Sequence, residues 1–159
     1  MTEAKRANED SGSRHDRELI ELLNELRVAL PGIQVLFAFL LTMPFTQRFP
    51  DVTTTQKTVF FVAFLSTAVA SILLIAPSII HRLLFRESDK ELILQVSNRL
   101  TVIGMFFLAT AITAVVFVIS DYLYGSPLSL TATAVIGLMA IGIWYVLPMT
   151  RRFTAEEGK

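Results

Sequence analysis

Hydrophobic residues are concentrated in four long runs, at residues 28–45, 58–80, 100–123 and 128–147. A helix needs about 20 mostly apolar residues to cross roughly 30 Å of bilayer hydrocarbon. The four runs have about this length, and residues 58–80 and 100–120 include no charged side chain. Because a charge at the membrane centre costs several kcal/mol, the pattern predicts an all-α polytopic membrane protein with four transmembrane helices.

A soluble helical bundle and a cleaved signal peptide fit the hydrophobic runs less well than membrane spans do. Each helix of a soluble bundle would show a polar face, whereas residues 59–80 offer only serine, threonine and one proline as breaks in the apolar surface. Such hydroxyls bond back to their own helix and are tolerated in lipid. A cleaved signal peptide does not fit, because the first run follows a mixed-charge leader and no small-residue cleavage site comes after it.

The segment before the first run divides into two parts. Residues 1–13 are polar, which predicts a disordered leader. Residues 14–30 predict an amphipathic cytoplasmic helix at the membrane surface or against the bundle, preceding a four-helix transmembrane domain at residues 28–148. Pro31 and Gly32 are expected to let the chain turn into the first span. The apolar face of the amphipathic helix consists of leucines, at Leu19, Leu22, Leu23, Leu26 and Leu30.

The opposite face of that helix is acidic, with Glu18, Glu21 and Glu25. A helix on a lipid surface usually carries lysine and arginine instead, so we expect this face to contact a protein partner. Within the chain, the pattern fits a solvated charged face and, less well, a pairing of Glu21 or Glu25 with Arg82 or Arg99. The residues of this predicted inner-boundary cluster are Glu21, Glu25, His81, Arg82, Asn98 and Arg99.

Lysine and arginine are distributed unevenly over the segments between the runs. Short loops rich in these residues stay in the cytoplasm. Of the 14 Lys and Arg residues, only Arg48 and Lys57 lie in the first or the third loop. The leader, the second loop and the tail at residues 149–159 carry the others. The distribution predicts a multi-pass protein of the plasma membrane with both termini in the cytoplasm.

Composition narrows the chemistry further. The chain is 53% hydrophobic and 18% charged, has zero formal net charge and contains no cysteine. The absence of cysteine excludes disulfides, thiolate metal sites and cysteine nucleophiles. With only two histidines, His15 and His81, and no paired-histidine motif, we expect no metal and no cofactor. There is no nucleophile–base pairing and no phosphate loop, so we expect neither an enzyme nor a nucleic-acid partner.

Gln34 is the only amide well inside any of the four runs. On a continuous helix it shares one stripe with Asn24, Arg27, Ala38 and Thr42. A pore-lining face would have this pattern, wet at its cytoplasmic end. A hydrogen bond from Gln34 between packed helices, with a free energy of about 1 kcal/mol, would produce the same pattern, so both interpretations remain open.

Asp121 is a carboxylate at the outer end of the third run, beside Tyr122 and Tyr124. Its position fits a surface-exposed side chain and also a group at the mouth of a vestibule. Intramembrane polar and ionisable groups often mark transport pathways. The candidates for such a pathway are therefore Asn24, Arg27, Gln34, Thr42 and Asp121.

Several short motifs resemble a known family. They are ELLNELRVALPG at residues 21–32, QVLFAFLL at 34–41, and the pairs Ala76-Pro77, His81-Arg82 and Asn98-Arg99. Together they resemble a family of small four-helix membrane proteins of unknown function, found mainly in actinobacteria, some of which carry the label sodium:proton antiporter. The resemblance implies the cytoplasmic membrane of a bacterium. An antiporter generally needs a titratable carboxylate at membrane depth, and no span has one near its centre.

Three functions remain open from the sequence. The first is a passive channel for ions or small solutes, formed between subunits of a homo-oligomer because four short helices enclose little space. The second is a non-transporting scaffold or accessory subunit that docks through the acidic helix. The third is a cation/proton antiporter that uses Asp121, or His81 with Glu25. The alignment of polar residues on one face favours the channel.

Overall fold

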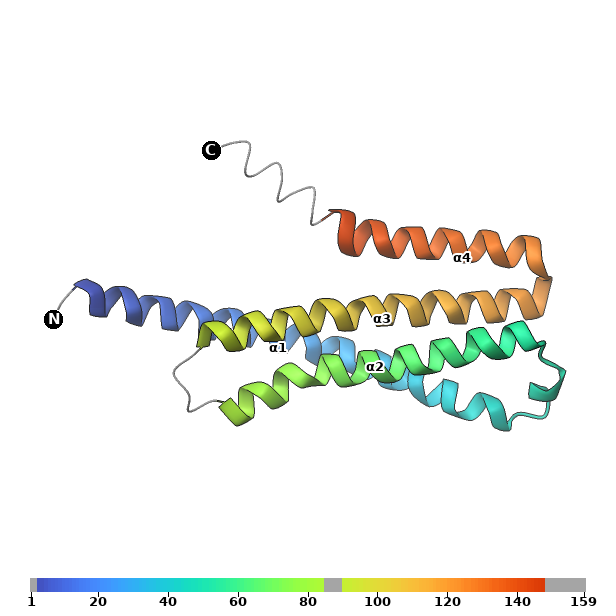
Figure 1. Cartoon of the computed structure of the whole chain (residues 1–159), viewed down its shortest axis with the longest axis horizontal. Coiled ribbons are helices and arrows are strands. Elements are labelled where there is room, and N and C mark those ends of the chain that lie inside the picture. Colours follow the sequence, from blue (N-terminus) through green and yellow to red (C-terminus); the bar gives the residue numbers. More distant parts are fainter. Residues whose placement is uncertain (1–2, 85–89, 148–159) are drawn as a thin grey trace. The chain divides into compact units, whose positions relative to one another are not determined.

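The computed structural model is all-helical and describes residues 3–84 and 90–147, with side chains described for residues 17–83, 91–125 and 127–147. The predicted tail at residues 149–159 lies outside the described residues. Figure 1 labels the helices and colours them along the sequence from blue to red. The elements are α1 (Glu3–Thr42), the 3-10 turns η1 (Met43–Phe45) and η2 (Phe49–Asp51), α2 (Thr54–Leu84), α3 (Lys90–Tyr124), α4 (Ser126–Ile141) and a π-helical turn η3 (Gly142–Val146).

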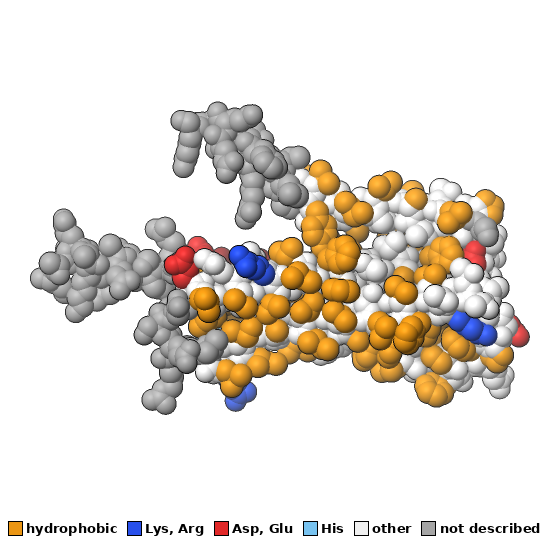
Figure 2. All heavy atoms as spheres, in the orientation of Figure 1, with side chains coloured by type: hydrophobic (Ala, Val, Ile, Leu, Met, Phe, Trp, Pro, Cys, Tyr) orange, Lys and Arg blue, Asp and Glu red, His pale blue; other side chains and the backbone are white. Residues whose placement is uncertain are grey.

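All four helices are long and apolar enough to cross a membrane. The apolar segments are Arg17–Phe45, Thr54–Leu83, Glu91–Tyr124 and Pro127–Val146. On the face shown in Figure 2, hydrophobic side chains are spread along the helices, and charged side chains lie near the helix ends. The prediction of an all-α protein with four candidate spans is therefore confirmed.

Helix α1 differs from the sequence prediction at its beginning. It continues without a break from Glu3 to Thr42, with Pro31 inside it, whereas a disordered leader, an amphipathic helix and a turn at Pro31-Gly32 were expected. A separate amphipathic helix is therefore not confirmed. A proline removes one backbone donor, but neighbouring groups can compensate for that loss inside a long apolar helix. Pro77 likewise lies inside α2 and does not end it.

Buried residues recur at helical spacing along α1, α2 and α3. On α1 they lie seven residues apart, on α2 most steps are three or four, and on α3 the steps vary from two to seven. Each of these helices therefore buries one stripe of its surface, as an amphipathic spacing predicts. The buried positions are Leu19, Leu26, Ile33 and Leu40 on α1, Gln56, Phe60, Ala63, Ser66, Thr67, Ala70, Leu74 and Pro77 on α2, and Ile93, Ser97, Gly104, Ala109, Ala111, Ala114 and Val118 on α3.

The chain divides into two compact units. Unit 1 comprises Met1–Phe39 and Thr67–Phe106, and unit 2 comprises Leu40–Ser66 and Phe107–Lys159. In unit 1, α2 and α3 approach closely at Gly104. A Cβ atom built there would lie 2.8 Å from Leu74 Cγ and 3.2 Å from Leu73 Cβ. An alanine at this position would force Leu74 or Leu73 to shift, and the close approach agrees with the use of small residues between membrane helices.

In unit 2, helix α4 follows α3 after a single residue. Gly125 has φ 80°, in the left-handed region that favours glycine, and its N–H donates to the Asp121 carbonyl at 3.1 Å. Helix α4 then contacts α3, where the site of a Cβ on Gly137 lies 3.4 Å from Thr113 Cγ2. The loop before α2 is held by an edge-to-face contact between Phe49 and Phe60, with ring centroids 5.5 Å apart.

Candidate functional site

Four polar residues of unit 2 form a hydrogen-bonded group, here called the outer-turn network: Thr53, Gln56, Asp121 and Ser129. Gln56 Nε2 donates to Asp121 Oδ2 at 2.8 Å, and Ser129 Oγ donates to Asp121 Oδ1 at 3.1 Å. Both carboxylate oxygens therefore accept a hydrogen bond. The network connects the first turn of α2, the last turn of α3 and the first turn of α4.

The α2 part of this network is set by the local sequence. Thr53 precedes the helix, and Gln56 lies three residues later. Gln56 N–H donates to Thr53 Oγ1 at 3.2 Å, while Thr53 N–H donates to Gln56 Oε1 at 3.0 Å. This reciprocal capping box satisfies backbone donors that a helix start leaves unpaired. The remaining Gln56 amide group is then free to bond Asp121, so one glutamine both caps α2 and joins it to α3.

The burial of three of its members indicates that the outer-turn network stabilises the fold. Gln56 is only 5% exposed and Ser129 is fully buried, while Asp121 is half-buried. A buried polar group that loses its partner costs about 1–3 kcal/mol, and Asp121 supplies the acceptors for two such groups. The sequence suggested either a surface-exposed carboxylate or a group at the mouth of a vestibule for Asp121, and neither interpretation included these hydrogen bonds. Its side chain joins helix ends and is not a freely solvated surface group.

The predicted stripe on α1 lies on the outward face of that helix. Asn24, Arg27, Gln34 and Thr42 are all exposed, while the buried positions face the other way. Arg27 and Gln34 are separated by seven residues and directly follow the buried Leu26 and Ile33. No hydrogen bond joins the Gln34 side chain to another residue within the described ranges. The buried inter-helix bond that was considered for Gln34 is therefore not formed within unit 1.

The acidic and arginine side chains of the predicted inner-boundary cluster form no ion pair with one another among the described residues. Glu21, Glu25, Arg82, Asn98 and Arg99 are exposed, and His81 is half-buried. Within residues 17–83 and 91–147, neither Glu21 nor Glu25 forms an ion pair with Arg82 or Arg99. The pairing considered from the sequence is therefore not formed in this structure. The exposed side chains are compatible with a solvated charged face.

A surface groove of about 240 Å³ lies in unit 2 between the loop after α1 and the last turns of α3. We call it the loop–α3 groove. Its walls are mostly apolar and include one charged side chain, Arg48. A smaller cavity of about 20 Å³ shares three of its residues, Met43, Val118 and Ile119. The lining of the groove consists of Met43, Thr46, Arg48, Phe49, Val52, Val118, Ile119, Tyr122 and Leu123.

The model of a family of unknown function, DUF6328, matches residues 8–148 of the chain. The chain belongs to the DUF6328 family. No curated protein and no solved structure matched it. The predicted membership of a family of unknown function is thus shown. The four apolar helices are compatible with a DUF6328 protein that resides in a membrane.

Two residues of this DUF6328 site, Gln56 and Ser129, were not singled out from the sequence alone. Gln56 did have a signal, since a threonine followed three residues later by glutamine is a capping-box pattern. Ser129 had none, because its approach to Asp121 depends on the turn at Gly125 that directs α4 along α3. Among the described residues, no group of three His, Asp or Glu side chains is arranged to hold a metal ion.

Proposed function

We propose that this DUF6328 protein is a homo-oligomer in a membrane and that it conducts ions or small polar solutes passively along the outward face of α1. The observation that carries the proposal is Gln34. It lies within an apolar span, is exposed, and has no hydrogen-bond partner among the described residues.

The cost of an unpaired amide supports a second copy at this face. An amide in an apolar environment without a hydrogen bond costs roughly 2–7 kcal/mol, and lipid tails offer no partner. In a cyclic homo-oligomer the same face of every subunit can surround one axis. Copies of Gln34 would then meet each other or water. Arg27 lies about 10 Å away along the helix, as seven residues at 1.5 Å imply, and would line the mouth.

A route through a single chain has less support. The buried positions of α1, α2 and α3 are mostly small or apolar, and the described cavities are apolar as well. Proton-coupled exchange through Asp121 is also less well supported, because both oxygens of that carboxylate already accept hydrogen bonds. The acidic face of α1 offers some support to a scaffold instead, since Glu18, Glu21 and Glu25 are exposed.

The proposed location is the cytoplasmic membrane of a bacterium, with both termini in the cytoplasm. The support is the distribution of lysine and arginine, of which only Arg48 and Lys57 lie in the loops opposite the termini. With this orientation, Arg27 would lie at the cytoplasmic mouth of the proposed pathway.

The test is flux in liposomes that contain the purified protein. Ion and proton movement is recorded under imposed gradients, with empty liposomes for background. Gln34→Leu is compared with the wild type and with Thr131→Val. Thr131 is a matched control because it is also an exposed polar residue of a span, but its hydroxyl donates to the carbonyl of Pro127 at 3.0 Å in its own helix.

We expect the wild type and Thr131→Val to dissipate the gradient at similar rates. Gln34→Leu should reduce flux at least tenfold, because leucine removes the polar group from the proposed pathway. Equal flux in all three proteins would exclude a pathway at Gln34. Absence of flux from folded wild type would exclude conduction and favour the scaffold. Proton movement that requires sodium or potassium on the other side would indicate exchange instead.

A further inference from the structure

We infer that the loop–α3 groove is a binding site for one anionic phospholipid, with an acyl chain in the groove and the headgroup phosphate on Arg48. The inference concerns only unit 2. It requires that the protein resides in a membrane, which the four apolar helices support, and it does not depend on conduction along α1.

The groove has two chemically different parts. Its floor is apolar and includes the buried Val118, with Ile119 and Tyr122 of α3 on the exposed side. At its rim, the loop contributes Arg48, whose side chain is exposed and forms no ion pair or hydrogen bond with any described residue. An apolar channel that ends at an unpaired guanidinium matches the order of groups in a phospholipid. Arginine is well suited to bind phosphate through two parallel hydrogen bonds.

The dimensions of the groove suit part of an acyl chain. Its volume of about 240 Å³ corresponds to roughly eight water-sized groups at about 30 Å³ each. The adjoining small cavity continues the groove toward the middle of α3, because Val115, one turn before Ile119, lines this cavity. A chain that enters near Tyr122 and reaches Val115 would run about 10 Å along the helix.

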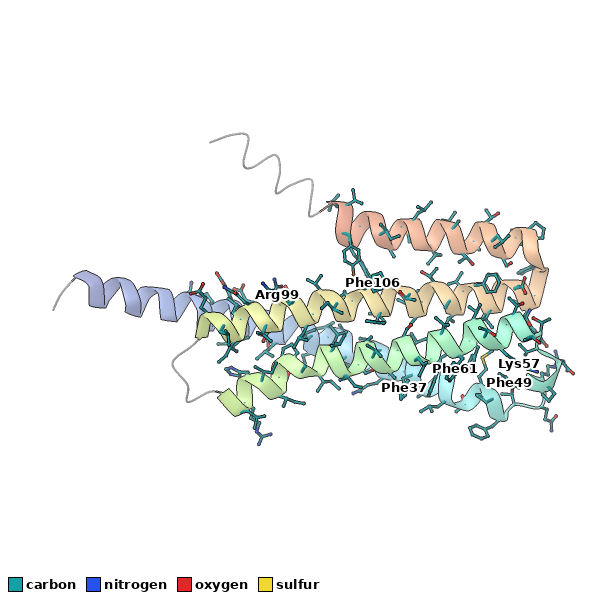
Figure 3. The ribbon with its side chains drawn as sticks, in the orientation of Figure 1. Phe37, Phe49, Lys57, Phe61, Arg99 and Phe106 are labelled. Atoms are coloured by element: carbon teal, nitrogen blue, oxygen red, sulfur yellow. The ribbon has the colours of Figure 1, made fainter. Side chains whose placement is uncertain are left out.

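The wall of the groove is fixed in place by local contacts. Phe49 lines the groove and packs edge-to-face on Phe60, at the end of α2 that also has Lys57 (Figure 3). Lys57 Nζ donates to the carbonyl of Pro50 at 3.5 Å, so a second cation, from α2, lies beside this loop. No acidic side chain lines the groove; Asp51 of this loop is not among the lining residues. The charge at the rim therefore favours an anionic headgroup over a zwitterionic one.

The experiment measures lipid binding to the full chain in detergent by native mass spectrometry and by the shift in melting temperature. Phosphatidylglycerol is compared with phosphatidylcholine of the same acyl chains, and with glycerol phosphate, which has the headgroup phosphate but no chain. The variants are Arg48→Gln, which removes the charge, and Ile119→Trp, which fills the groove from an exposed position. Arg99→Gln is the matched control, since Arg99 is an exposed arginine on α3 outside the groove (Figure 3).

We expect phosphatidylglycerol to bind the wild type more tightly than phosphatidylcholine, and glycerol phosphate to have no effect. Loss of one cation near an anionic lipid should weaken phosphatidylglycerol binding about fivefold, so Arg48→Gln should show at least this loss and Arg99→Gln no change. Ile119→Trp should weaken both lipids. Equal binding of the two lipids, equal losses in the two arginine variants, an unchanged Ile119→Trp, or stabilisation by glycerol phosphate alone would each overturn the proposal.

Discussion

The polar residues of the two units behave in opposite ways. In unit 2, Gln56, Asp121 and Ser129 of the outer-turn network are half or fully buried, and each carboxylate oxygen of Asp121 accepts a hydrogen bond. In unit 1, Glu21, Glu25 and Arg99 are exposed and form no ion pairs among themselves. Residue type alone therefore does not decide whether a polar group at a helix end stabilises the protein. The short connection between α3 and α4, and the capping of α2, bring the unit 2 groups together.

The difference between the units has an energetic consequence that mutations can measure. Exposed ion pairs contribute only about 0–1 kcal/mol, whereas loss of a partner from a buried polar group costs about 1–3 kcal/mol. Substitutions in the outer-turn network should therefore lower stability far more than substitutions of the exposed charges in unit 1.

The largest effect is expected for Asp121→Ala. It leaves the Gln56 amide without its acceptor and removes one hydrogen bond of Ser129, so the free energy of unfolding should fall by about 2–3 kcal/mol. Glu25→Ala, an exposed carboxylate of unit 1, is the control and should stay within about 0.5 kcal/mol of the wild type. Unfolding in detergent by heat or denaturant measures both. Equal effects of the two substitutions would show that the network is not a major source of stability.

The second comparison uses one glycine from each unit. In unit 1, Gly104→Ala places a methyl group 2.8 Å from Leu74 Cγ and should lower stability by about 1–3 kcal/mol through overpacking. In unit 2, Gly137→Ala meets only an ordinary contact of 3.4 Å with Thr113 and should raise stability by up to about 1 kcal/mol, because alanine favours the helix. Melting temperatures that shift in the same direction would contradict this assignment of close packing to unit 1.

The smallest effect is expected from the capping box. Thr53→Ala removes the acceptor for the Gln56 backbone N–H and should lower the free energy of unfolding by about 1 kcal/mol. Thr58→Ala is the control four residues after the start of α2, where the hydroxyl only donates to the carbonyl of Thr54 in its own helix. Thermal unfolding of both variants separates the cap from a general effect of threonine. Equal effects of the two substitutions would show that the capping box does not contribute to the stability of the outer-turn network.

The helices could be predicted from the sequence because their cause is local. Runs of about 20 apolar residues indicate membrane-spanning helices whatever their neighbours are, and the structure has four helices long and apolar enough to cross a membrane. The leucine face at Leu19 and Leu26 is also the buried face of α1. The expected break at Pro31 was wrong because a missing backbone donor does not end a long apolar helix when its neighbouring turns remain bonded.

The candidate site was less predictable because it depends on register. Gln34 was identified as the amide inside a span, but whether it points inward depends on the seven-residue repeat of buried positions on α1. Asp121 was identified as an isolated carboxylate. Its partners Gln56 and Ser129 are 65 residues before and 8 residues after it in the chain, so only the fold shows that they meet.

The single residue between α3 and α4 has a consequence for how the chain would enter a membrane during synthesis. Gly125 is the only residue between the two helices. With both termini in the cytoplasm, as proposed above, we expect α3 and α4 to be inserted together as one helical hairpin, with Asp121 near its tip. An insertion that lengthened this turn should allow α3 and α4 to be integrated one after the other.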